Sequence, residues 1–253
     1  GDDETMPGYY VHLATVNPKI KENRNFIYGV EMPDLLKKYF KAYGLNGARE
    51  KYDSIKINGM PDFSTFELRV QQTEKSNCRD GMHYGFSSNP DFMYFWNNLS
   101  EEQKRNPFYI GYLWHLLTDL LMYTYLDIET KFEIFAKTHA NDENLLELQN
   151  LEYKKLHNDW DKTNSRIRDM YPDVILPPEI IELDIVKFAS GNQLSYVDWE
   201  VIKSLTNYMR KFNPLEEDVN LIIENFISLL PQFKSDDYKE TLGKKLVLCP
   251  NRK

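Results

Sequence analysis

Residues 109–126 read YIGYLWHLLTDLLMYTYL, and this apolar stretch decides the fold. Asn106 and Pro107 precede it as an N-cap and a first-turn proline, so the sequence predicts a helix here. Its apolar residues lie on all sides, which is typical of a helix buried on every face. His115 and Asp119 are four residues apart and therefore project from the same side of this helix.

A buried ionised carboxylate at Asp119 needs a partner, because leaving it unpaired costs roughly several kcal/mol. One interpretation is a simple polar pair in which His115 donates to Asp119. The simplest explanation for an imidazole and a carboxylate on one buried face is a bound cation. A membrane span is a third alternative, since about 20 apolar residues cross a bilayer. The central His115 and Asp119 and the lack of a second span argue against it, so we expect no integral membrane segment.

Length and composition place the chain among ordinary globular proteins. Its 253 residues can form one large domain or two modest ones. We expect a single helical domain over 1–253, with a core at 6–170 and a C-terminal helical extension at 178–253. The formal charge of −8 argues against nucleic acid as a partner. It leaves a phosphate-bearing substrate open, because a bound metal reverses the local sign of a site.

Cysteine usage and the first residues bear on the compartment. Cys78 and Cys249 form neither a metal-ligand spacing nor a disulfide framework, so a reduced compartment is the default. The first ten residues, GDDETMPGYY, lack the basic and apolar regions of a secretory signal. We therefore expect a cytoplasmic protein, with a removed leader left open. The sequence does not indicate an oligomeric state.

Caps, prolines and apolar spacing predict a mainly α fold. A capping box at 100–103 marks one helix start. Between 45 and 80, glycines and prolines punctuate the chain, and 54–57 and 66–70 alternate like short strands. We expect a small irregular or β-hairpin insertion there. The predicted helices cover 6–16, 26–30, 33–43, 89–96, 109–126, 127–138 and 142–170, with three or four more between 179 and 246.

Further residues of metal-binding type precede the central helix. Taken alone, His12 is an ordinary core histidine, Asp34 a helix-dipole partner and His83 a turn cap. Their order matters more than any one of them. Along the chain come His12, Pro33-Asp34, His83 and then Gly111-Tyr112-x-x-His115-x-x-x-Asp119.

This order resembles the zinc-dependent phospholipase C family and is closest to its uncharacterised bacterial branch. The resemblance covers the first half of the chain strongly and reaches about residue 170 weakly. It implies an all-α fold, a phospholipase C-like helical bundle, with one to three zinc ions in a cleft. It also implies that His12 binds a neighbouring metal bridged through Asp119. The first metal site implied by the resemblance consists of Asp34, His83, His115 and Asp119.

The family's further metal site uses His-x-x-x-Glu, and the nearest match here is His157-x-x-x-Asp161. The aspartate shortens that carboxylate by one methylene, and a solvated i,i+4 pair is the alternative interpretation. An intervening family histidine has no counterpart, since Tyr125 stands near its place, and no N-terminal tryptophan is available as a ligand. These departures leave the third metal and phospholipid specificity open.

Function follows from the implied metals. Zinc favours imidazole and carboxylate ligands, although another divalent metal is possible. We expect a metal-dependent hydrolase acting on a small-molecule or lipid phosphoester, with metal-bound water as nucleophile and Asp34 orienting or deprotonating that water. The alternative is a non-catalytic helical module with a structural or vestigial metal site. A di-iron bundle and an HExxH protease are disfavoured, because the sequence contains no Glu-x-x-His and no HExxH.

Overall fold

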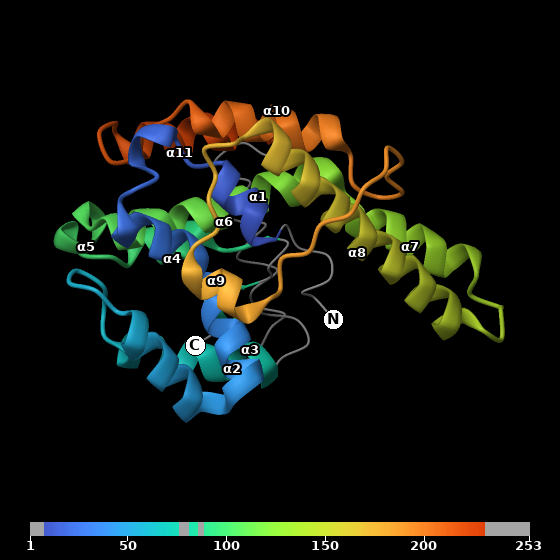
Figure 1. The fold of residues 1–253 in the computed structure, drawn as a ribbon, viewed down its shortest axis with the longest axis horizontal. Coiled ribbons are helices and arrows are strands. Elements are labelled where there is room, and N and C mark those ends of the chain that lie inside the picture. Colours follow the sequence, from blue (N-terminus) through green and yellow to red (C-terminus); the bar gives the residue numbers. More distant parts are fainter. Residues whose placement is uncertain (1–7, 76–80, 86–88, 231–253) are drawn as a thin grey trace.

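A computed structural model describes residues 8–75, 81–85 and 89–230, and its long elements are all helices (Figure 1). The all-α prediction is therefore confirmed. Short 3-10 helices lie at Pro18–Ile20, Phe63–Thr65 and Gly81–His83. The α-helices are α1 (Tyr9–Ala14), α2 (Arg24–Ile55), α3 (Glu67–Lys75), α4 (Phe92–Asn97), α5 (Glu101–Arg105), α6 (Pro107–Leu126), α7 (Ile128–Thr138), α8 (Leu145–Met170), α9 (Pro178–Leu183), α10 (Trp199–Arg210) and α11 (Val219–Ser228).

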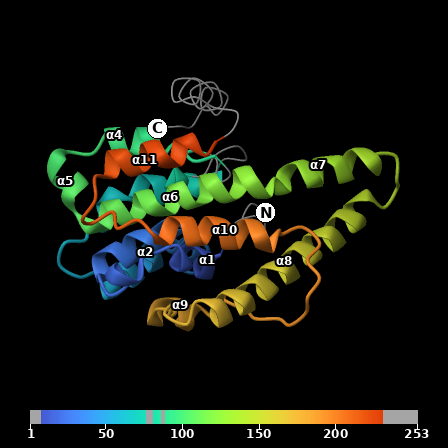
Figure 2. The same cartoon turned by 90° about the horizontal axis from the view of Figure 1, so that it is seen from above.

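The predicted central helix is α6, which runs through the middle of the molecule (Figure 2). Pro107 occupies its first turn, and the side chain of Asn106 accepts a hydrogen bond from the backbone N–H of Phe108 at 3.0 Å. Helices α2, α4, α5 and α10 pack against α6, which explains its apolar composition on every side. The described residues include no helix that is both long and apolar enough to cross a bilayer.

Two glycines allow α2 and α6 to touch backbone to backbone. A Cβ atom on Gly29 would lie 2.0 Å from the carbonyl oxygen of Phe108, and one on Gly111 would lie 2.1 Å from that of Phe26. No side chain fits at such distances, so glycine is required at both positions. This close crossing places the turn around Val30 beside the middle of α6, where the polar residues of that helix lie.

Helix α2 differs from the prediction of two separate helices at 26–30 and 33–43. The chain continues helically through Pro33, and its break comes at Gly44, whose φ is 72°. Proline is favoured in the first turn of a helix, so Pro33 resembled a start signal. Inside a helix, the same residue removes one backbone donor without necessarily ending the element.

The β-hairpin predicted within 45–80 is wrong for the described part of that segment. Ser54 and Ile55 complete α2, and the other proposed strand, 66–70, runs from a 3-10 turn into α3. Phe66 and Val70 are both buried, and their spacing of four residues fits one face of a helix. In so short a stretch, this spacing is also compatible with the alternation of a strand. Residues 76–80 lie outside the described ranges.

The later helices begin and end near the predicted places. The capping box at Ser100 and Gln103 is present at the start of α5. Figure 2 shows α7 extending beyond the body of the molecule and α8 returning beside it. Helix α8 then contacts α1, and α10 contacts both α1 and α6. The parts of the predicted helices that fall within 1–7 and 231–246 lie outside the described residues.

Candidate metal centre

Five residues predicted as metal ligands meet in one place. His12 comes from α1, Asp34 from α2, His83 from the 3-10 helix at 81–83, and His115 and Asp119 from α6. Four of the side chains are almost completely buried, whereas that of Asp34 is 15% exposed. The buried four are those of His12, His83, His115 and Asp119. Asp34 therefore lies on the side of the cluster that is open to solvent.

The two oxygens of Asp119 lie next to different histidines. Its Oδ1 lies 2.9 Å from Nε2 of His12. Its Oδ2 lies 3.2 Å from Nε2 of His83 and 3.2 Å from Nε2 of His115. This carboxylate thus lies between the imidazole of His12 and those of His83 and His115.

Asp34 approaches the imidazoles of His83 and His115 as well. Its Oδ1 is 3.3 Å from Nε2 of His83, and its Oδ2 is 3.5 Å from Nε2 of His115. The two Nε2 atoms are themselves 3.1 Å apart. A tetrahedral zinc ion with bonds of about 2.0–2.1 Å separates its ligand atoms by about 3.3 Å. The observed separations of 3.1–3.5 Å are close to this value.

The orientation of His115 is fixed by the backbone of α2. Its Nδ1 lies 2.6 Å from the carbonyl oxygen of Val30. A carbonyl only accepts, so Nδ1 carries the hydrogen and Nε2 presents a lone pair to the cluster. A metal-binding histidine is commonly held in this way by a hydrogen bond from its other nitrogen. The ring of His115 also stacks on that of His12, with centroids 3.7 Å apart and planes 5° apart.

The buried polar atoms of His12 and Asp119 lack ordinary hydrogen-bond partners among the described residues. Among the described residues, neither ring nitrogen of His12 and neither oxygen of Asp119 has a partner in hydrogen-bonding geometry, despite their close approach. A buried carboxylate without donors requires positive charge. The residues present therefore fit a bound cation, and two overlapping groups can hold one: His12, His115 and Asp119, and Asp34, His83 and His115.

The protonation states favour metal binding as well. Burial acts to raise the pKa of Asp119, but the neighbouring His12 and His115 outweigh it and hold this pKa well below its usual value. Burial, together with His115, lowers the pKa of His12. Asp119 is therefore ionised and His12 neutral near pH 7, and these are the forms in which carboxylates and imidazoles bind metals.

The remaining predicted pair, His157 and Asp161, lies elsewhere on α8. His157 is exposed and Asp161 partly buried, and neither belongs to the two candidate groups within the described residues. Burial raises the pKa of Asp161. A metal site at this pair stays a prediction.

The sequence showed no sign of two groups that fix the structure, one on α8 and one beside the candidate metal centre. Asp159, between His157 and Asp161, accepts hydrogen bonds from the backbone N–H groups of three consecutive residues, Ser195, Tyr196 and Val197. It was hidden in a charged stretch of sequence. The carbonyl of Val30 has no side-chain signal at all, so no pattern could have indicated its contact with His115.

Comparison with family models, curated proteins and solved structures finds no match for this chain. The class of the protein is therefore given by its own geometry. It is an all-helical protein with a buried histidine and aspartate cluster that could hold a metal ion.

Proposed function

We propose that this protein is a metal-dependent phosphoester hydrolase with zinc as its first candidate metal. The observation that carries the proposal is the convergence of Nε2 of His83 and His115 with oxygens of Asp34 and Asp119, at separations of 3.1–3.5 Å. The order of these residues along the chain, their resemblance to the zinc-dependent phospholipase C family and the all-helical fold support the same proposal.

The geometry supports two neighbouring metal positions. Because Nδ1 of His115 is engaged by Val30, only its Nε2 is available, and one nitrogen binds one ion. We assign His115 to the position shared with Asp34, His83 and Oδ2 of Asp119. The neighbouring position is then formed by His12 and Oδ1 of Asp119, which gives the bridging arrangement that the resemblance implies.

The metal and the residues around it have separate roles in the proposed hydrolysis. Bound divalent metal supplies a water of lowered pKa and stabilises negative charge on phosphoryl oxygens. Asp34 is the ligand nearest to solvent, so its carboxylate is placed to orient an attacking water and to accept its proton. Val30 holds His115 in the tautomer that the site requires. The substrate is a small-molecule or lipid phosphoester.

Elemental analysis combined with an activity assay tests this proposal. We expect the purified protein to contain at least about one equivalent of zinc or a similar metal and to hydrolyse an aryl phosphodiester. Asp119→Asn is expected to lose metal and at least about 100-fold in activity, because it weakens both positions. His139→Gln, which changes a half-exposed histidine just after the end of α7, serves as the control. Unchanged activity in metal-free protein would overturn the proposal.

A second candidate function is a non-catalytic helical module with a structural metal. The near-complete burial of the cluster favours it, since only Asp34 among the five ligands is appreciably exposed. Full metal content without turnover on a panel of phosphoesters, together with a large fall in the melting temperature on chelation, would select this candidate.

A further inference from the structure

A second buried carboxyl cluster lies between α2 and α9. Glu31 is 2% exposed and lies one helical turn before Asp34, and Glu179 of α9 is 5% exposed. The two carboxyl groups are near enough for Glu179 to act on Glu31 and raise its pKa. Two buried carboxylates side by side repel each other, so at least one of them needs a compensating partner.

Only one of the two carboxyls has such a partner. Nη2 of Arg24 lies 3.4 and 3.5 Å from the two oxygens of Glu179. The same guanidinium lies over the ring of Tyr28, with its carbon 4.6 Å from the ring centroid. By contrast, no donor among the described residues reaches either oxygen of Glu31. The guanidinium of Arg24 is therefore the one positive charge described beside both Glu31 and Glu179. If both acids are ionised, one negative charge is left without compensation.

A proton resolves this imbalance better than a metal ion does. If Glu31 is protonated, its hydroxyl donates to the Glu179 carboxylate, and the net charge of Arg24 and the two acids is zero. A metal ion would be repelled by the guanidinium that already lies beside Glu179. The other titratable groups that act here are Tyr28 and Tyr39 of α2 and Glu182 of α9, and none of these supplies a positive charge.

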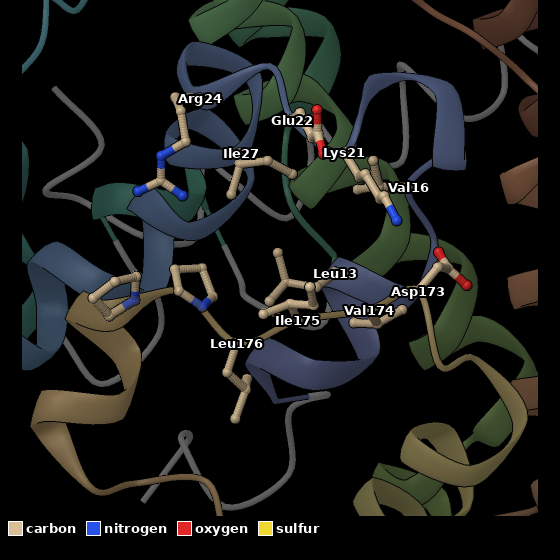
Figure 3. Close-up of a pocket in the computed structure, with 12 residues that line it drawn as sticks. Leu13, Val16, Lys21, Glu22, Arg24, Ile27, Asp173, Val174, Ile175 and Leu176 are labelled. Carbon is tan, nitrogen blue, oxygen red and sulfur yellow. The ribbon is translucent and has the colours of Figure 1, made fainter.

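The pair lies where the connection from α8 reaches the start of α9. Residues 171–177, here called the strap, connect α8 to α9, and Glu179 lies just after the strap. Asp173 and the strap residues that follow it form one wall of a cavity of about 290 Å³, and residues between the end of α1 and the first turn of α2 form the other (Figure 3). The only other ion pair described between α2 and α9 is exposed, with Nζ of Lys51 3.0 Å from Oε1 of Glu182.

We propose that Glu31 and Glu179 share one proton and form a latch that holds α9 and the strap against α2, and that loss of this proton loosens them. The latch does not depend on the metal centre or on the proposed hydrolase function. It requires only the two acids, Arg24 and the packing of α9 on α2.

The direction of the pH dependence follows from the pKa. Burial, and then the adjacent Glu179, raise the pKa of Glu31 well above its usual value, against the opposing charge of Arg24. A group whose folded-state pKa is raised stabilises the fold fully below its unfolded pKa. This contribution is lost as the pH rises towards the folded-state pKa. The latch is therefore closed in acid and weakened in alkali.

Hydrogen exchange with Glu31→Gln tests the latch. Glutamine has the shape of the protonated acid and keeps a donor for Glu179, but it does not titrate. In the unchanged protein, we expect the protection factors of amides in the strap and α9 to fall at least about fivefold between about pH 5 and pH 9. In Glu31→Gln they are expected to stay constant. Glu182→Gln, which removes only the exposed ion pair, should keep the pH dependence of the unchanged protein.

Infrared spectroscopy provides a second measurement. The carbonyl stretch of a protonated carboxylic acid should be present in the unchanged protein near pH 7 and absent in Glu31→Gln. Strap protection that does not vary with pH, or the same variation in Glu31→Gln, would overturn the latch, as would the absence of that carbonyl band. Metal content should be equal in the two proteins, so failure of the latch is distinct from failure of the proposed metal centre.

Discussion

His115 donates from Nδ1 to the carbonyl oxygen of Val30 at 2.6 Å, and this bond connects the middle of α6 to α2. It leaves Nε2 of His115 as a lone pair directed at the oxygens of Asp34 and Asp119. The backbone of one helix thus sets the tautomer of a candidate ligand on another. The geometry of the candidate metal centre consequently depends on how closely these helices pack.

The tautomer of His115 is the first prediction. In metal-free protein above about pH 7, ¹⁵N NMR should show His115 with hydrogen on Nδ1, because the carbonyl of Val30 can only accept. Addition of zinc should shift the Nε2 resonance most. His139 is half-exposed, lies outside the cluster and serves as a reference within the same spectrum. A hydrogen on Nε2 of His115 would contradict the prediction.

The second prediction concerns the crossing of α2 and α6. Gly111→Ala should destabilise the fold by about 1–3 kcal/mol or more, because its Cβ would lie 2.1 Å from the carbonyl oxygen of Phe26. Urea unfolding measures this change. Because the substitution displaces the helices that carry candidate ligands, the protein should also bind zinc with lower affinity. Calorimetry measures this affinity.

Gly8→Ala is the matched control for that substitution. A Cβ on Gly8 meets nothing within 4 Å, so the cost should stay below about 1 kcal/mol, with zinc binding unchanged. Equal stability of the Gly111→Ala and Gly8→Ala proteins would contradict the close crossing.

Local signals in the sequence predicted much of the fold. Asn106 and Pro107 marked the start of α6, and Ser100 marked that of α5, because capping and first-turn chemistry act over three or four residues. The errors came where one local pattern has two outcomes. Pro33 fits either the start or the interior of a helix, and Phe66 with Val70 fits either a short strand or one helical turn.

The candidate site was predictable in its residues but not in its geometry. The spacing of His115 and Asp119 placed them on one face of α6, and the order of His12, Asp34 and His83 suggested ligands through a resemblance. Their convergence depends on long-range packing, which no local pattern encodes.

The third prediction is the acid sensitivity of the metal-free protein. Burial, together with His115, lowers the pKa of His12, so the folded state binds fewer protons than the unfolded state. The stability that follows from this shift is present above the unfolded pKa of about 6.5. It is lost as the pH falls towards the folded-state pKa, by at most about 1.4 kcal/mol per pH unit.

Urea unfolding of the metal-free protein at about pH 7.5, 6.5 and 5.5 measures this slope. His12→Gln should flatten it, since glutamine does not titrate, and His139→Gln should leave it unchanged. An equally steep loss of stability in His12→Gln would show that other groups cause the acid sensitivity.

The fourth prediction separates Asp159 from Asp161 on α8. Asp159→Asn should cost about 2–3 kcal/mol, because the carboxylate accepts from the N–H groups of Ser195, Tyr196 and Val197, and hydrogen bonds to charged groups are strong. Asp161→Asn should cost less than about 0.5 kcal/mol, because Asp161 is only partly buried and burial already disfavours its charge. Both variants should keep the metal content of the unchanged protein. Loss of metal from Asp161→Asn would instead show that α8 supplies a ligand, and the site predicted at His157 and Asp161 would then be real.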